Sequence, residues 1–380
     1  MPRCGEVGVF WKAIQLAYRV ARRIELALWT FVITGLITAN SLVSGRRMSH
    51  ENGITCRGKI TLLPELDLPS HAFFKPGRTF PCRLRHGAAS WLDDAKLVVR
   101  SASLKFADHR YESPLDLMLN SGEVPLFWNA RTFLSFMIGT IGGRGKHWLR
   151  HLRKYPQAMV GGGSSVRRNP ACYTGMSYNS KTCSGFVSED GDDYYCRFRI
   201  IPAEGWSPES ETGLPEPEDY AHPWLQNPLP RETHCRNYLK KQLVKRLHDE
   251  GVAARYRLQI QLRPWNKGES PQWVSSAWPW DETHTPWRDL AEIEITEVLD
   301  HAEALHTAFH LGHHPPSLPL PKARSIDDPH SLNHLRHWSI LARHARELHY
   351  KIRGTPDPIP DSRHSKDWIA VPPMSDPPGE

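Results

Sequence analysis

The sequence predicts an α+β fold, an antiparallel β-barrel with additional C-terminal and N-terminal helices. Several segments between residues 57 and 262 alternate apolar and polar side chains, as strands with one solvated face do. Segments with helical spacing of apolar residues lie before and after this region. The chain has 380 residues, 39% of them apolar and 23% charged, which is enough to bury one large core.

Residues 1–45 are predicted to form a separate N-terminal helical segment. Its apolar run, Leu26–Val43, is flanked by a pair of arginines on each side. As a helix this run would extend about 27 Å, just short of the hydrocarbon core of a bilayer. The run therefore fits a membrane anchor, an interfacial helix, or a helix packed on the rest of the protein.

Residues 46–354 are predicted to form the barrel domain together with its C-terminal helices. The segments with strand patterns are Lys59–Leu63, Leu97–Phe106, Leu115–Leu119, Tyr194–Pro202 and Tyr256–Leu262. Residues 161–169 are predicted to form a polar, glycine-rich loop. Many short strands followed by terminal helices are typical of a barrel with helical additions.

Two amphipathic segments follow the strands. Arg236–Gly251 and Ser331–Arg353 both repeat apolar residues at helical spacing, so each is predicted to be one helix. The tail, residues 355–380, is rich in proline and aspartate and is predicted to be disordered.

Composition excludes some classes of function. The formal charge of +7 suits anionic partners such as a phosphate, a carboxylate or a membrane surface. The sequence contains no helix-turn-helix, RNP or zinc-finger pattern, so nucleic-acid binding is not predicted. Seven cysteines, none spaced as C-x-x-C, favour free thiols in an intracellular protein, cytoplasmic or membrane-associated.

A series of motifs carries a family resemblance. In order they are S-H-x-x-G at Ser49–Gly53, F-F-x-x-G-R-T-F-P-x-R-L-R-H at Phe73–His86, S-x-K-F-A-D at Ser103–Asp108 and P-L-D-x-x-x-N-S-G-E at Pro114–Glu123. Their order and spacing resemble the catalase-related allene oxide synthases, which share the barrel of haem catalases. The resemblance continues to about residue 353. It implies haem b as cofactor and a lipid hydroperoxide or fatty acid as partner.

The resemblance also implies three catalytic residues. His50 matches the histidine above the haem iron, and Asn120 matches the neighbouring asparagine that orients the peroxide. Ser49 lies where these synthases have threonine and true catalases have an apolar residue, which favours a fatty-acid hydroperoxide over hydrogen peroxide. We expect His50 and Asn120 to converge on one flat cavity inside the barrel.

Further residues match those that bind the cofactor. Arg47, Arg85 and Arg346 resemble the arginines that pair with the haem propionates, a task suited to bidentate guanidinium groups. Phe127 matches the aromatic residue that packs on the porphyrin face.

The sequence departs from the family at the axial iron ligand. The family has tyrosine four residues after the arginine that Arg336 matches, whereas this chain has Ile340 there and Ser339 beside it. Neither binds ferric haem well. His337 could ligate iron after a modest rotation of the helix, whereas Tyr350 is about 15 Å further along it.

Two functions are therefore open. One is a haem-dependent lyase or dehydratase that acts on lipid hydroperoxides. The other is a catalytically impaired or haem-free member of the fold that acts as a binding module. A hydrogen-peroxide-removing catalase is disfavoured by Ser49 and by the missing tyrosine. The sequence leaves the oligomeric state open.

Overall fold

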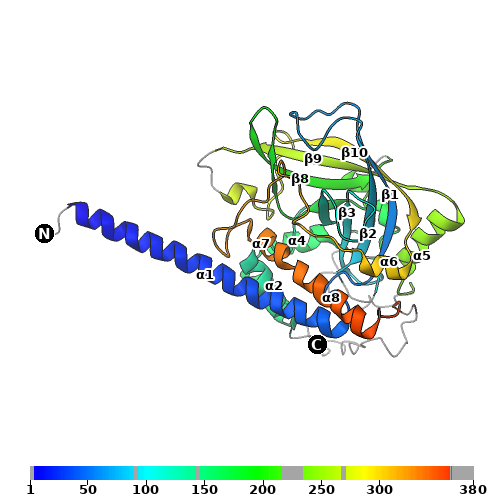
Figure 1. Ribbon diagram of the computed structural model, residues 1–380, viewed down its shortest axis with the longest axis horizontal. Helices are drawn as coiled ribbons and strands as arrows, with labels where there is room; N and C mark the ends of the chain where they lie inside the picture. The colour runs from blue at the N-terminus through cyan, green and yellow to red at the C-terminus, as the bar shows by residue number, and fades with distance from the viewer. Residues whose placement is uncertain are drawn as a thin grey trace, which may run out of the picture.

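A closed barrel forms the body of the molecule (Figure 1). The computed structural model describes residues 4–89, 93–141, 146–204, 206–215, 234–266, 271–359 and 361. Eight strands form the barrel: β1 (Gly53–Leu62), β2 (Thr79–Ala88), β3 (Val98–Lys105), β4 (Asp116–Ser121), β6 (Tyr178–Ser180), β8 (Asp193–Pro202), β9 (Ala254–Pro264) and β10 (Trp287–Val298). Neighbouring strands are antiparallel in the order β2-β1-β10-β9-β8-β6-β4-β3, and β3 pairs back with β2. The predicted fold class is confirmed.

Alternation along the strands fills the barrel. On β2, Leu84 points into the main core, whereas Arg83 and Arg85 on either side of it lie on the outer face of the wall. The core also takes Leu104 from β3 and Ile293 from β10. Each such side chain stabilises the fold by roughly 1.5–3 kcal/mol relative to an exposed one. Two short strands, β5 (Val166–Arg167) and β7 (Ser184–Val187), pair with β3 and β8.

Helices pack around the outside of the barrel. They are α1 (Cys4–Ser44), α2 (Ala130–Ile141), α3 (Lys146–Lys154), α4 (Gln157–Ser165), α5 (Tyr238–Val244) with a π-helical turn (Lys245–Asp249), α6 (His301–His306), α7 (Ser331–Trp338) and α8 (Ile340–Arg353). In Figure 1, α1 runs beside α2, α7 and α8 and then projects well beyond the body.

Two local predictions were wrong. Residues 161–169 are not a loop, because 161–165 complete α4 and β5 follows directly. A Cβ at Gly161 would lie 1.9 Å from the carbonyl oxygen of Pro125, so this glycine permits close packing and does not mark a turn. The segment Ser331–Arg353 is not one helix, because it breaks at Ser339 into α7 and α8.

The described part of the C-terminal segment is anchored by hydrogen bonds. The carbonyl of Pro356 contacts Nε2 of His301 (2.9 Å), and that of Asp357 accepts a bond from Arg46 (3.3 Å). The carbonyl of Ile359 accepts a bond from Asn237, which directly precedes α5 (3.1 Å). Residues 355–359, which composition assigns to a disordered tail, thus line the body; residues 360 and 362–380 lie outside the described residues.

Candidate active site

His50 lies in the short connection between α1 and β1. Its φ is +59°, in the left-handed region that a residue with a Cβ rarely adopts. Gly45, with φ +66°, ends α1 five residues earlier. Such a conformation in a non-glycine residue costs free energy and clusters at functional sites, so it supports the assignment of this connection to the site.

The two nitrogens of the His50 ring have different surroundings. Nδ1 lies 2.7 Å from Oγ of Ser49, whose hydroxyl can orient the ring. Nε2 is buried and has no hydrogen-bond partner among the described residues. Burial, with a contribution from Arg85 and Arg336, lowers the pKa of His50 to about 4. The imidazole is therefore neutral at pH 7, and Nε2 is free to exchange a proton with a ligand.

Asn120 faces the same surface of the wall as His50. On β4, Asn120 pairs with Ser101 of β3, and Ser101 in turn pairs with Gly87 of β2. Gly87 lies next to His50, since a Cβ at Gly87 would be 3.4 Å from the carbonyl oxygen of His50. Asn120 is thus about two strand spacings, or roughly 10 Å, from the backbone of His50. In the described part of the chain its amide makes no hydrogen bond, so it too is available to a ligand.

The expected position inside the barrel was wrong. Leu119 belongs to the barrel core, so Asn120, its neighbour on β4, points the opposite way. The same alternation puts Arg85 outside, opposite to Leu84. The site therefore lies on the outer face of the wall, because apolar side chains fill the interior.

A buried cluster of cations borders the site. Arg85 donates to the carbonyl of Glu51 (3.0 Å), and Arg47 donates to the carbonyl of Thr307 (2.7 Å). Burial and the charge of Arg47 lower the pKa of Arg85 to about 9 and that of Arg346 to about 10. Glu51 contacts Arg47 at 3.9 Å; within the described residues no carboxylate forms an ion pair with Arg85 or Arg346. The cluster therefore has the surroundings of a site for added anions.

Sequence reasoning missed Glu51, although it follows His50 directly. The side chain is buried and accepts a bond from the backbone N–H of Arg47 (2.9 Å). Its position beside a candidate catalytic histidine was the available signal, but only the fold shows that one carboxylate serves several arginines.

Arg336 approaches the site from α7. It donates to the carbonyl of Met118 on β4 (3.3 Å), and burial lowers its pKa to about 10. Phe127 is half-buried between the barrel wall and the helices, with ring centroids 4.8 Å from Phe133 and 5.1 Å from Phe136.

The two residues that the resemblance matches to the family's iron ligand, Ile340 and Ser339, have no side chain suited to ferric iron. Ile340 begins α8 one turn after Arg336, and the hydroxyl of Ser339 donates to the carbonyl of Arg336 (2.6 Å). His337 is exposed, and its ring lies 5.1 Å from that of His310. Tyr350 lies at the cation cluster, and burial raises its pKa.

The residues thus fit part of a haem and not the whole. The cation cluster suits its two carboxylates, and the buried, unpartnered Nε2 of His50 suits the face where a peroxide would bind. Ile340 and Ser339 do not supply the oxygen ligand that the iron would need on the opposite face.

Comparison with known proteins gives two relatives whose names include a lipoxygenase. The chain is 33% identical over 303 residues to the allene oxide synthase-lipoxygenase protein of Plexaura homomalla, across 79% of this chain and 28% of that protein. It is 28% identical over 370 residues to a linolenate 9R-lipoxygenase of a Nostoc species, across 93% of this chain and 45% of that one. The chain therefore spans less than half the length of these relatives. No family model matches the sequence.

Solved structures agree on the fold. A fungal catalase superposes with a TM-score of 0.58 at 16% identity, across 82% of this chain and 62% of that one. Catalase A of Saccharomyces cerevisiae superposes with a TM-score of 0.56 at 17% identity, across 82% and 63%. Taken with the sequence similarity, the fold places this chain in the catalase-related allene oxide synthase family.

Proposed function

We propose that this chain binds and processes fatty-acid hydroperoxides at the site between His50 and Asn120. The observation that carries the proposal is the neutral, buried and unpartnered Nε2 of His50. A base in this state takes the proton of a hydroperoxide O–H group and can return it to the product oxygen. The names of the two relatives, a synthase–lipoxygenase and a lipoxygenase, support a lipid as the molecule that carries the peroxide.

In this proposal the other polar residues orient the peroxide and the base. The free amide of Asn120 holds the peroxide oxygens, and the hydroxyl of Ser49 fixes the His50 ring through Nδ1. Ser49 is polar where true catalases have an apolar residue, which favours a lipid hydroperoxide over hydrogen peroxide.

The proposed cofactor is a haem, haem b by resemblance, held through its carboxylates. Arg47, Arg85 and Arg346 supply the cations, and Phe127 packs on the ring. Haem supplies redox chemistry at iron when it is bound in this family. Because Ile340 offers no ligand atom, the roles proposed for this chain are cofactor binding and proton transfer by its own side chains.

The cofactor proposal is tested by absorbance. We expect purified protein reconstituted with haemin to show a Soret band that differs from that of free haemin. The variants Arg85→Ala and Arg346→Ala should weaken haem uptake, and Lys75→Ala, a surface control, should not. Uptake that is equal in all four proteins would contradict the proposal.

A second function, a binding module without turnover, is favoured by Ile340. It predicts that wild-type protein takes up little haem and consumes no lipid hydroperoxide. It also predicts that Ile340→Tyr produces a tyrosinate-type haem spectrum, because the new phenol lies one turn from Arg336. An unchanged spectrum in Ile340→Tyr would count against this second function. Rapid oxygen release from hydrogen peroxide would instead revive a catalase.

We also propose that α1 lies in a membrane interface. It is long and apolar enough to cross a bilayer: within Trp11–Ser44, an 18-residue stretch has a mean hydropathy of 1.7, and 28% of that stretch is buried. Several of its outward side chains, among them Leu28, Phe31 and Val43, are large and apolar, while Leu26 and Ile33 pack against the protein. A helix docked on a protein in water exposes mainly polar side chains. Because one face packs on α7 and α8, an interfacial position suits it better than a span.

A further inference from the structure

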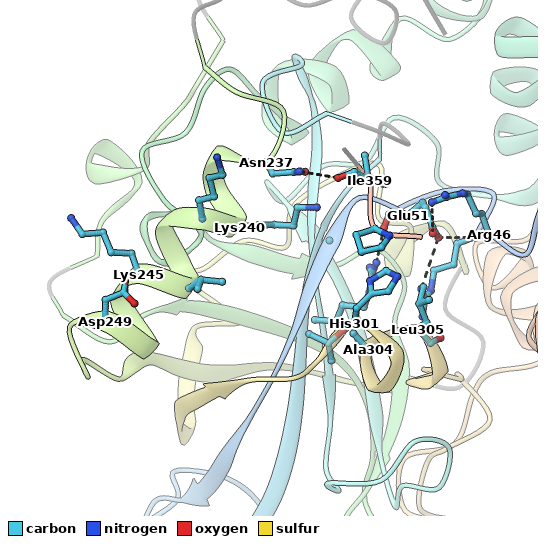
Figure 2. A pocket seen from close by; sticks show the side chains of 17 residues that line it. Arg46, Glu51, Asn237, Lys240, Lys245, Asp249, His301, Ala304, Leu305 and Ile359 are labelled. Atoms are coloured by element: carbon cyan, nitrogen blue, oxygen red, sulfur yellow. Dashed lines mark hydrogen bonds and ion pairs between the residues drawn. The ribbon is translucent and has the colours of Figure 1, made fainter. Parts of the chain in front are cut away.

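A cavity of about 600 Å³ opens beside the cation cluster. Figure 2 shows its two sides: Asn237 and Lys240 of α5 on one, and Arg46 with Glu51 from the α1–β1 connection on the other. His301 of α6 lies between them, and the C-terminal segment forms one wall. The volume is in the range of small-molecule sites.

The lining combines an excess of cations with apolar side chains. Six lysines and arginines face two carboxylates: Arg46, Arg47, Arg85, Lys240, Lys241 and Lys245 against Glu51 and Asp249. Val244, Leu305 and Ile359 supply apolar surface in the same cavity. If two arginines pair with the carboxylates of a cofactor, the remaining cations still exceed the carboxylates.

Lys240 is the inner cation of the α5 side. Its Nζ donates to Oδ1 of Asn52 (2.6 Å); burial lowers its pKa, and the charge of Asp94 opposes this shift. Lys241, by contrast, is exposed and already pairs with Asp361. Lys245 is also exposed and contacts Glu250 at 3.6 Å. Lys240 therefore offers the cavity a positive charge with donors to spare.

We propose that this cavity binds the carboxylate end of a fatty acid, with Lys240 and Arg46 as its cationic contacts and Val244, Leu305 and Ile359 against the chain. The proposal rests on the lipid substrate class proposed above and adds a second contact region to it. The cavity shares Arg47 and Glu51 with the site around His50, so the two regions adjoin. An anion with an apolar body matches both parts of the lining.

The test is direct binding to the full chain, without turnover. Calorimetry would use linoleate, methyl linoleate and dodecyl phosphate, all below their critical micelle concentrations. We expect linoleate to bind at least about tenfold more tightly than the methyl ester, which has lost the charge. Equal binding of ester and acid overturns the proposal, as does binding of dodecyl phosphate alone.

Two variants locate the binding. Lys240→Met should weaken linoleate about tenfold and leave the methyl ester unchanged. Val244→Phe fills the cavity from a partly exposed position and should weaken both. Lys75→Met is the control, because Lys75 lies in the turn at the far end of β1 and β2 and pairs with Glu189 (2.7 Å).

Melting curves would confirm that each variant folds. Unchanged linoleate binding in both folded variants overturns the proposal. If linoleate binds here but hydroperoxides are never consumed, the proposed enzymatic function fails and this site stands.

Discussion

At the scale of single residues, the state of His50 decides what the site can do. A histidine whose buried ring nitrogen has no partner among the described residues loses hydration without a replacement, which costs free energy. Its left-handed backbone adds to this cost. His50, which the motifs identify as the catalytic histidine, therefore has both unfavourable features, whereas an ordinary loop histidine would turn toward solvent.

Removal of the imidazole should abolish most turnover. We expect His50→Gln to lower the rate of linoleate hydroperoxide consumption by roughly 10²–10⁴, because an amide cannot take the proton. Ser49→Ala should have a smaller effect, since it removes only the contact to Nδ1. Peroxide loss would be followed by a ferrous-oxidation assay, and an unimpaired His50→Gln variant would refute the assigned role.

The pH dependence should report the same group. Because the pKa of His50 is lowered to about 4, the base is neutral throughout the range from pH 8 to pH 5. Turnover limited by His50 should therefore stay constant across this range and fall as the pH approaches 4. A decline centred near pH 6.5, the ordinary value for histidine, would show that Nε2 is solvated in the working protein.

At the scale of elements, the best predicted segments were those in which apolar and polar residues alternate with a clear periodicity. The strict alternation of Tyr194–Pro202 predicted β8 to within a residue, because one face of that strand meets the core. The break at Ser339 was not predictable from spacing: the apolar stripe continues across it, and the break depends on a hydroxyl bonded to the carbonyl of Arg336. Helix α1 begins at Cys4, well before the apolar run Leu26–Val43. Once a helix is nucleated, each further residue adds a backbone hydrogen bond, so the helix can extend beyond the part that packs on the protein.

Charges on the outward face of α1 should release the protein from lipid. We expect the double variant Leu28→Glu, Phe31→Glu to lose most binding to anionic phospholipid vesicles, measured by flotation. Both side chains are exposed, 58% and 78%, so the melting temperature should change little. The control is Leu214→Glu, an exposed leucine in the described part of the connection after β8. Equal flotation of all proteins would exclude an interfacial role for α1.

At the scale of the whole molecule, the order of motifs predicted the barrel, and the wall's alternation decided where the site lies. The motifs identify His50, Asn120 and Arg336 as candidate site residues, but they do not show on which face of the barrel wall these residues lie. That depends on register, which pairs Gly87 with Ser101 and Ser101 with Asn120. The departure from the family at Ile340, a residue without a ligand atom, stays a prediction from the sequence.

Acid should destabilise the fold through buried histidines. Burial lowers the pKa of His86 to about 3 and that of His50 to about 4, below the value of about 6.5 in an unfolded chain. The unfolded state then binds more protons between about pH 6.5 and 4, so stability falls as the pH falls through this window. Each group contributes at most about 1.4 kcal/mol per pH unit.

Urea unfolding across this window would measure the effect. His86 stacks on Tyr173 with ring centroids 4.6 Å apart and contacts the hydroxyl of Tyr256 (2.8 Å). His86→Phe removes the titrating group and should flatten the slope, even though it lowers stability at pH 7 by losing the contact to Tyr256. A midpoint independent of pH in the wild type would contradict this account.

The ring of strands also sets when the protein can be completed during synthesis. Strand β1 pairs with β10, and Ile60 faces Ile293, so its partner leaves the ribosome about 230 residues later. At ordinary rates of translation that interval lasts on the order of 10–50 s. Throughout it, the nascent chain presents an unpaired strand edge directly after a long apolar helix, and both attract other chains. Slow, chaperone-dependent production in a foreign host is the expected consequence of closing the barrel with its earliest and latest strands.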